Sequence, residues 1–241
     1  MAEWTVPSMW QGATCFILGG GPSVLTQFNV PEKVREQLRN PKQGHSSLLS
    51  PYLEPIHDKK VIGVNNAYQI GDWIDVLFFG DCSWYLYHKK KLAAWPGLKV
   101  SCCPRFANRP KNDPEGIKYL YKDRGHTSGV SKNKKKVSWN KNSGAAAINL
   151  AVHLGVKRIV LLGFDMKLDE DSKQWWHSGH HHVPRKQGDN RKPKPFKRHL
   201  TGFPAIKRDT DELGVEILNA NPESKIDVFP KVDIKDYLNV K

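Results

Sequence analysis

The sequence has no long apolar run. None of its hydrophobic stretches approaches the roughly 18–20 residues that a membrane-spanning helix requires, so we do not expect a spanning protein. The N-terminal segment MAEWTVPSMWQGATCFILGGGPS also lacks a basic start and a small-residue cleavage site. These are the marks of a secretory signal, and their absence argues against secretion. We therefore expect a cytoplasmic protein.

Cysteine is scarce. The chain has 4 cysteines in 241 residues, which are Cys15, Cys82, Cys102 and Cys103. Two of them are adjacent and none has CxxC spacing, so the set is a poor disulfide framework and a poor zinc site. We expect four reduced thiols, as is usual in the cytoplasm.

Acidic residues are the minority among the charged ones. There are 24 Asp and Glu against 38 Lys and Arg, which gives a net charge of +14 and a pI near 9.6. This balance favours an anionic partner such as nucleic acid, nucleotide phosphates or anionic lipid. The alternative is a basic surface that only maintains solubility. Disorder of the whole chain is excluded, since 8 Trp, 9 Phe and 7 Tyr suffice for a core.

Short apolar runs that end at glycine or polar residues indicate an α/β fold. The predicted strands cover residues 13–18, 61–64, 75–80, 99–103, 159–165 and 215–219. Residues 31–39, 145–155 and 203–214 have helical patterns, and Asn142 and Gly155 bracket the clearest of these helices. Residues 40–59 and 105–141 show little regular pattern. We found no repeat and no linker, so we expect a single Rossmann-like domain, residues 1–241, with a mostly parallel sheet.

A long polar segment follows the strand that ends at Asp165. Residues 167–202 are expected to form a basic loop or lid, because a structureless stretch of this length in a compact domain is usually functional. Its basic residues fit an arm that binds nucleic acid; they are Arg185, Lys186, Arg191, Lys192, Lys194, Lys197 and Arg198. The alternative is an ordinary solvated loop.

The first predicted strand ends in a glycine-rich turn. Gly19, Gly20, Gly21, Pro22 and Ser23 precede a short helical pattern, and such a turn offers backbone N–H groups to a phosphate. The sequence is neither GxGxxG nor the P-loop GxxxxGK[ST]. The alternative is a tight turn without a ligand.

Other predicted strands also end in polar residues. Asn65 and Asn66 follow the second strand, Asp81 the third and Asp165 the fifth. The carboxyl ends of parallel strands line one crevice, where amides can bind a base or ribose and carboxylates can bind ribose or Mg²⁺. The alternatives are self-capping asparagines and aspartates that cap neighbouring helices.

Histidines and tryptophans cluster in the basic segment. His177, His180, His181 and His182 could supply a general base or metal ligands, although no HExxH motif or cysteine partner accompanies them. Clustered loop histidines can also be merely solvated. Trp175 and Trp176 precede them and could stack on a base or sugar, or anchor the loop in the core.

The order of these motifs is more specific than any one of them. GGGPS, VNNAY, FGD and NSGAAAINLAVHLGVKRIVLLGFDM follow one another. This order resembles the bacterial lipooligosaccharide sialyltransferases, the archaeal 6-hydroxymethylpterin diphosphokinases and the flagellar motility accessory factors. It also resembles phage-encoded proteins with GVNNAY, NSG and LLGxDM. The resemblance covers residues 13–23, 61–84, 142–182 and 225–232.

The resemblance implies a nucleotide-binding transferase. It would assign residues 19–23 to the nucleotide phosphates and Asn65 or Asn66 to the nucleotide. Ser143 and Gly144 stand where the sialyltransferase TSG motif lines the donor site. One of the four histidines would be the base that deprotonates an acceptor hydroxyl.

The sequence departs from the sialyltransferase pattern at two points. Gly20 stands where the sialyltransferases have Asn, so the resemblance does not imply CMP-sialic acid as the donor. The tyrosines that those enzymes use on the donor phosphate have no evident match.

We therefore expect a glycosyltransferase-like enzyme that moves a sugar from a nucleotide-sugar, with a UDP-sugar as first choice. Phage-like origin, which would mean the host cytoplasm, and the positive charge suggest hydroxymethylated DNA as acceptor. One alternative is an ATP pyrophosphokinase that uses Mg²⁺ on Asp81 and Asp165. Another is a DNA-binding protein without catalysis. The need for a metal stays open.

Overall fold

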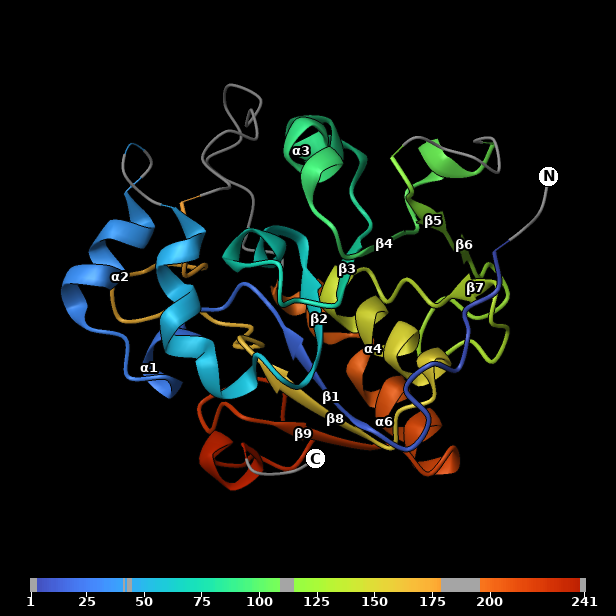
Figure 1. Ribbon diagram of the computed structural model, residues 1–241. Coiled ribbons are helices and arrows are strands. Elements are labelled where there is room, and N and C mark those ends of the chain that lie inside the picture. Colours follow the sequence, from blue (N-terminus) through green and yellow to red (C-terminus); the bar gives the residue numbers. More distant parts are fainter. Residues whose placement is uncertain (1–3, 41, 43–44, 109–114, 179–195, 239–241) are drawn as a thin grey trace.

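A computed structural model describes residues 4–40, 42, 45–108, 115–178 and 196–238. Its centre is a parallel sheet of seven strands in the order β5-β4-β3-β2-β1-β8-β9 (Figure 1). The strands are β1 (Thr14–Leu18), β2 (Lys60–Val64), β3 (Val76–Phe79), β4 (Leu98–Ser101), β5 (Lys118–Tyr119), β8 (Arg158–Leu162) and β9 (Glu216–Asn219). β6 (Tyr121–Lys122) and β7 (Lys136–Val137) form a separate parallel pair. The predicted α/β class with a mostly parallel sheet is confirmed.

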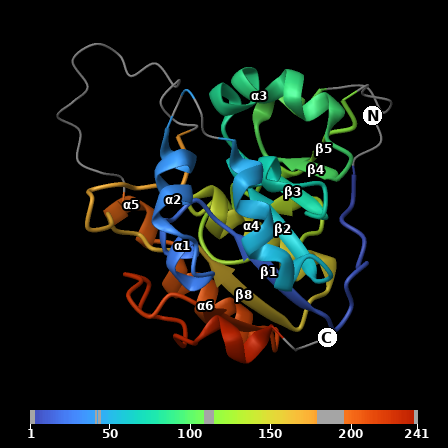
Figure 2. The ribbon, with the colours of Figure 1, turned by 60° about the vertical axis from the view of Figure 1, so that its left-hand side comes forward.

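Helices cover both faces of the sheet (Figures 1 and 2). α4 (Ser143–Leu154) and α6 (Phe203–Glu212) lie on one face. The other face carries α1 (Ser23–Gln27), α2 (Glu32–Arg39), α3 (Cys82–Ala94) and the 3₁₀ segments η1 (Ser46–Ile56) and η2 (Asn65–Ile70). η3 (Pro104–Phe106), α5 (Phe196–Leu200) and η5 (Ile234–Tyr237) complete the described elements.

Alternating side chains of the central strands build two cores. In β1, Cys15 and Ile17 pack toward α4, while Phe16 and Leu18 pack toward α1 and η1. All four are fully buried, as expected for a strand covered on both faces. β1 therefore has to be almost uniformly apolar, which is the pattern that revealed it in the sequence.

α4 has the boundaries that its sequence signals predict. The Asn142 side chain accepts hydrogen bonds from the backbone N–H groups of Gly144 (2.8 Å) and Ala145 (3.3 Å). Gly155 ends the helix with φ +93°, a left-handed conformation that suits glycine. The small side chains of this helix let it lie close to the centre of the sheet, so its N-terminus is fixed beside the strand ends.

Two segments expected to be irregular contain regular structure. η1 lies within residues 40–59 and carries Pro51 and Pro55, which suit a 3₁₀ segment better than an α-helix. β5, β6 and β7 lie within residues 105–141 and have only two residues each, which is too short for a readable alternation. Within the described residues, no helix has the length and apolar character needed to cross a membrane.

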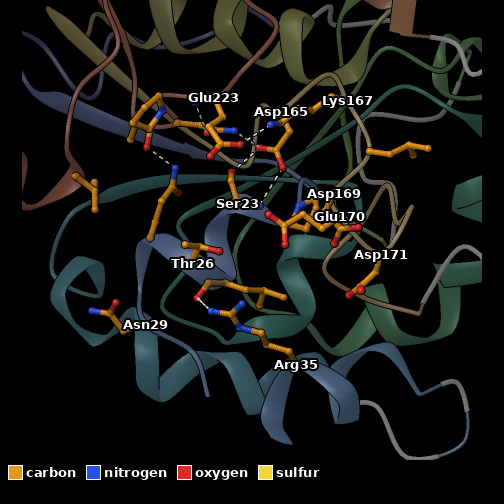
Figure 3. A pocket seen from close by; sticks show the side chains of 18 of the residues that line it. Ser23, Thr26, Asn29, Arg35, Asp165, Lys167, Asp169, Glu170, Asp171 and Glu223 are labelled. Atoms are coloured by element: carbon orange, nitrogen blue, oxygen red, sulfur yellow. Dashed lines mark hydrogen bonds and ion pairs between the residues drawn. The ribbon is translucent and has the colours of Figure 1, made fainter. Parts of the chain in front are cut away.

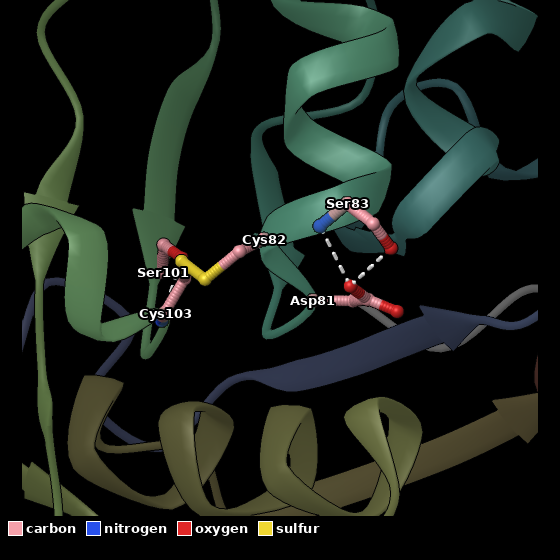
Figure 4. The surroundings of a disulfide bond; sticks show 5 residues. All are labelled: Asp81, Cys82, Ser83, Ser101 and Cys103. Carbon is pink, nitrogen blue, oxygen red and sulfur yellow. Dashed lines mark hydrogen bonds between the residues drawn. A yellow bond between two sulfur atoms is a disulfide. The ribbon is translucent and has the colours of Figure 1, made fainter.

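A disulfide corrects the expectation of four reduced thiols. Cys82, the first residue of α3, is bonded to Cys103, which follows β4, with their Cα atoms 5.6 Å apart (Figure 4). Cys15 and Cys102 are free and buried. The sequence could not reveal this pair, because the pairing of β3 with β4 brings the two cysteines together.

The disulfide gives a direct prediction. A chain denatured without reductant should show two titratable thiols, and Cys103→Ser should lower the free energy of unfolding by about 3 kcal/mol, because the bond closes a loop of moderate length. Thiol titration and urea unfolding measure the two effects. Reductant should destabilise the native chain by a similar amount and leave the variant unchanged; four thiols in the unreduced chain would contradict the bond.

Candidate nucleotide-binding site

A pocket of about 310 Å³ lies at the carboxyl ends of the central strands. β1 has β2 on one side and β8 on the other, so the chain reverses its direction across the sheet at this point. Ligands of open parallel sheets bind at such a switch point. The residues that line the pocket are Gly19, Gly20, Gly21, Val64, Asn65, Asp81, Trp84, Trp139, Lys141, Asn142, Ser143, Gly144, Gly163, Phe164, Asp165, Met166, Lys167, Gln174, Trp175, His177, Phe196, Arg198 and His199.

The glycine turn after β1 is fixed on both sides. The backbone N–H of Gly21 donates to the carbonyl of Gly163 at 2.9 Å, which ties the turn to the end of β8. Trp176 donates from its indole N–H to the carbonyl of Gly19 and from its backbone N–H to that of Gly20, both at 3.0 Å. The turn is therefore held before any ligand arrives.

Asp165 closes the turn from the end of β8. Its carboxylate accepts hydrogen bonds from the backbone N–H (2.9 Å) and hydroxyl of Ser23, and from the side-chain amide of Asn221 (2.8 Å). Burial raises the pKa of Asp165 above its usual value, and the bonds from Ser23 and Asn221 offset part of that rise. Asp165 is thus a structural clasp as well as a lining residue.

The two asparagines after β2 have different environments. Asn65 lines the pocket with a left-handed backbone (φ +52°), and its side-chain oxygen is buried without a hydrogen bond to the described part of the chain. Asn66 lies behind the wall, where its oxygen accepts from the indole N–H of Trp84 at 2.6 Å. Of the two, only Asn65 lines the pocket, and its side-chain oxygen lacks a hydrogen-bond partner in the described part of the chain.

Asp81 and the start of α4 form the opposite wall. The carboxylate of Asp81 caps α3 by accepting from the backbone N–H and hydroxyl of Ser83, both at 2.8 Å (Figure 4). Ser143 and Gly144 lie in the first turn of α4 and line the pocket, so the positive end of that helix dipole faces it. Predicted residues from four strand ends and from α4 thus line this pocket, although Asp81 already has a capping role and Asn66, Pro22 and Ser23 do not line it.

Strained backbone is concentrated around the pocket. Lys141 and Met166 have left-handed conformations, with φ +55° and +52°. Such conformations are costly for these residue types, and they cluster at binding sites. The turn at Lys141 is fixed by the buried side chain of Asn140. Its amide oxygen accepts a hydrogen bond from the backbone N–H of Gly129, and its amide nitrogen donates to the carbonyls of Gly129 and Ser138, so Lys141 is held at the pocket.

The predicted histidine cluster contributes one described side chain to this pocket. His177 is buried, and its imidazole packs edge-on against Trp176. A Cβ on Gly20 would lie 3.8 Å from Nε2 of His177 and 3.1 Å from the ring of Trp175. Gly20 therefore leaves open the space in front of both side chains. His180, His181 and His182 lie outside the described residues.

The two neighbouring tryptophans divide the alternatives that the sequence left open. Trp176 is fully buried and anchors the glycine turn, whereas Trp175 lines the pocket and offers an aromatic ring.

The basic segment is described only in part. Its residues Lys197 and Arg198 lie on α5 and are exposed, and Arg198 lines the pocket. Arg185, Lys186, Arg191, Lys192 and Lys194 lie outside the described residues.

Trp139, His199 and Lys141 are among the lining residues that were not singled out as site residues from the sequence. Trp139 packs against Gly80, where a Cβ would lie only 2.1 Å from its ring. His199 projects from α5, and burial together with the neighbouring Arg198 lowers its pKa. Lys141 appeared only as one basic residue among several. For Trp139 the sequence offered one signal, Gly80 of the FGD motif, because a glycine there leaves room for a large ring. No neighbouring residues marked His199 or Lys141 as lining residues.

The donors for a metal are limited in the described part of the chain. Within it, no group of three or more His, Cys, Asp or Glu side chains is arranged to hold a metal ion. Both oxygens of Asp165 already accept hydrogen bonds.

Pro22 and Ser23 were predicted to hold phosphates. They line a different and larger cavity, on the far side of the contact between Ser23 and Asp165.

Solved structures with a similar fold include two from bacteria. The MAf glycosyltransferase from Magnetospirillum magneticum AMB-1 aligns with a TM-score of 0.59 and 12% identity, over 100% of this chain and 37% of that chain. The monofunctional alpha-2,3-sialyltransferase Cst-I from Campylobacter jejuni aligns with a TM-score of 0.51 and 20% identity, over 92% of this chain and 82% of that chain.

These likenesses establish the fold. This chain spans little more than a third of the Magnetospirillum protein, at 37% of its length. No model of a protein family matches the sequence, and no curated protein matches it. The architecture expected from the order of motifs is therefore shared with solved bacterial glycosyltransferases.

Proposed function

We propose that this protein is a glycosyltransferase-like enzyme that takes its sugar from a nucleotide-sugar. The observation that carries the proposal is the pocket at the switch point, where Gly20 leaves room beside Trp175 and His177 and where Asn65 also lines the wall. Backbone groups and the start of α4 suit a diphosphate, and the ring of Trp175, which lines the pocket, suits a base or sugar. The likeness of the fold to one structure named as a glycosyltransferase and one named as a sialyltransferase supports the same conclusion.

The residues of the pocket suggest how the reaction proceeds. The ring nitrogen of His177 would take the proton from an acceptor hydroxyl as its oxygen attacks the anomeric carbon of the sugar, while the nucleoside diphosphate leaves. Lys141 and Arg198 carry positive charge at the same pocket and would stabilise the leaving diphosphate. The protein's main contribution is positioning, with general-base assistance from the histidine.

A thermal-shift panel of CMP, UDP, GDP, ADP and ATP tests the proposal. A nucleotide at 100 times its Kd stabilises the fold by about 2.7 kcal/mol, which raises the Tm of a chain of this size by roughly 5–10 °C. We expect this shift with a nucleoside diphosphate, UDP being the first choice. Gly20→Trp, which would fill the pocket, should abolish it. No shift with any nucleotide would contradict the proposal.

We expect the shift to be the same with and without Mg²⁺. Both carboxylate oxygens of Asp165 already accept hydrogen bonds, from Ser23 and Asn221, and one oxygen of Asp81 accepts the hydrogen bond that caps α3. Repeating the panel with EDTA in excess over Mg²⁺ checks this. A large shift seen only with ATP and Mg²⁺ would instead favour pyrophosphoryl transfer.

The acceptor is proposed to be DNA carrying hydroxymethylated bases. The net charge of +14 and the exposed Lys197 and Arg198 beside the pocket support a polyanion. Lys197→Glu/Arg198→Glu should weaken DNA binding and lower the slope of log K against log salt by about 2. Lys60→Glu/Lys157→Glu is the matched control, because both lysines are exposed at the opposite ends of the strands. Equal effects of the two pairs would contradict a specific DNA-binding face.

A further inference from the structure

A second, larger cavity adjoins the nucleotide pocket. It measures about 960 Å³ and lies on the far side of the contact between Ser23 and Asp165, among α1, α2, residues 167–171 and residues 220–223 (Figure 3). Asp165 and Lys167 line both spaces. Its volume is at the upper end of the range for small-molecule sites. A molecule in this cavity would therefore border one in the nucleotide pocket.

The cavity is acidic although the chain is strongly basic. Four basic side chains line it, against seven carboxylates: Glu32, Asp165, Asp169, Glu170, Asp171, Glu223 and Asp233. Three of the basic groups are already paired. Arg39 bridges Asp169 and Asp171 (2.8 Å to the latter), Lys167 pairs with Glu223 at 2.5 Å, and Arg35 pairs with Glu32 at 3.8 Å. A phosphate or carboxylate ligand would meet excess negative charge, which excludes the nucleotide and the DNA from this cavity.

The polar groups that remain suit hydroxyls or an amine. Gln27 and Arg39 both line the cavity, and Oε1 of the first and Nε of the second are buried without a hydrogen bond to the described residues. Buried polar atoms are normally satisfied, so two orphans in one cavity indicate a missing partner. Thr26 and Glu170 are exposed at its rim and add a hydroxyl and a carboxylate. Leu25 and Ile234 contribute apolar wall, against which a sugar ring can pack.

We propose that this cavity binds a sugar unit that is uncharged or carries an amine, and that it rejects sugars bearing a carboxylate. The inference rests on the proposed function, since the sugar belongs either to the donor, with its nucleotide across the contact between Asp165 and Ser23, or to a saccharide acceptor, which would then replace the DNA acceptor proposed above. In both cases the shared wall brings the sugar next to the nucleotide pocket. The specificity then differs from that of an enzyme whose sugar is a carboxylic acid.

The experiment compares free glucose, glucosamine and glucuronate with UDP, UDP-glucose and UDP-glucuronate, using calorimetry and ligand-observed NMR. We expect glucose and glucosamine units to bind roughly tenfold or more tightly than glucuronate, the size of effect that unfavourable charge contacts produce. Binding of the free sugars identifies an acceptor site. If only UDP-glucose gains affinity over UDP, the cavity holds the sugar of the donor.

A matched pair of variants locates the effect. Thr26→Trp would fill the cavity from α1 and should abolish the sugar contribution, while UDP alone binds as in the wild type. Leu48→Trp is the control, since Leu48 is exposed on η1 and lines neither space. Should Thr26→Trp fail to fold, Glu170→Lys at the exposed rim should bring glucuronate binding closer to that of glucose.

Each failure has its own signature. If no nucleotide binds but the free sugars do, the proposed function fails and the sugar site stands. If UDP binds and no sugar, free or linked, adds affinity, the sugar site is wrong and the nucleotide site stands. Equal binding of glucose and glucuronate, or unchanged sugar binding in Thr26→Trp, would also overturn the inference.

Discussion

Replacing His177 with Gln should lower the rate of transfer by about 10²–10⁴-fold, the usual contribution of a general base. His177 lines the candidate nucleotide pocket and faces the space that Gly20 leaves open, so its ring is the described imidazole best located to accept a proton there. Nucleotide release from the donor identified by the thermal-shift panel gives the rate. Binding of the nucleotide alone should change little, because glutamine keeps a polar group at this position.

Two further measurements separate catalysis from packing. The fall in kcat of His177→Gln should come without a fall in the free energy of unfolding or in the UDP-induced Tm shift. His45→Gln is the matched control, since His45 is exposed and lines neither cavity. Wild-type turnover in His177→Gln would show that the base lies elsewhere, with His199 of the same pocket as the next residue to replace.

Gly21→Ala should abolish nucleotide binding and lower the free energy of unfolding by about 1–3 kcal/mol, as overpacking does. A Cβ on Gly21 would lie 2.6 Å from both the carbonyl oxygen of Gly163 and the Cγ of Asp165. Neither atom can yield without breaking the contact between the ends of β1 and β8. Urea unfolding and the UDP-induced Tm shift measure the two losses, at about 2–4 °C of Tm for each kcal/mol.

Two other glycines provide the comparison for Gly21. Gly125→Ala should be neutral, because the only atom within 4 Å of a Cβ there is a carboxylate oxygen of Asp123 at 3.7 Å. Gly20→Ala should keep most of the stability but weaken binding, since its Cβ would face the movable ring of Trp175. If Gly21→Ala bound UDP normally, the glycine turn would have no role in holding the nucleotide.

The sequence predicted the elements whose signals are local. The apolar run before Gly19 marked β1, and Asn142 and Gly155 marked both ends of α4. Polar residues at the ends of β1, β2, β3 and β8 predicted a shared crevice, because parallel strands bring their carboxyl ends to one edge. Each of these inferences needs only neighbouring residues and the geometry of a parallel sheet.

Other features depend on contacts between distant segments. Asn65 and Asn66 are indistinguishable in the sequence. In the structure, the indole N–H of Trp84 donates a hydrogen bond to Asn66, whereas the side-chain oxygen of Asn65 has no such partner in the described part of the chain. Likewise, Trp176 is held in the core by its hydrogen bonds to the glycine turn, whereas its neighbour Trp175 lines the pocket. Such assignments follow from which surfaces meet, which local patterns do not encode.

By itself, the sequence determined the α/β class, the position of the glycine turn and the set of polar residues at the strand ends. The tertiary structure decided how they are used. The hydrogen bonds that Asp165 accepts from Ser23 and Asn221 separate an acidic cavity from the candidate nucleotide pocket, and the pairing of β3 with β4 joins Cys82 to Cys103. The physical reason is that periodicity and composition fix local conformation and burial, whereas hydrogen bonds and charge balance within a site arise only when distant segments pack together.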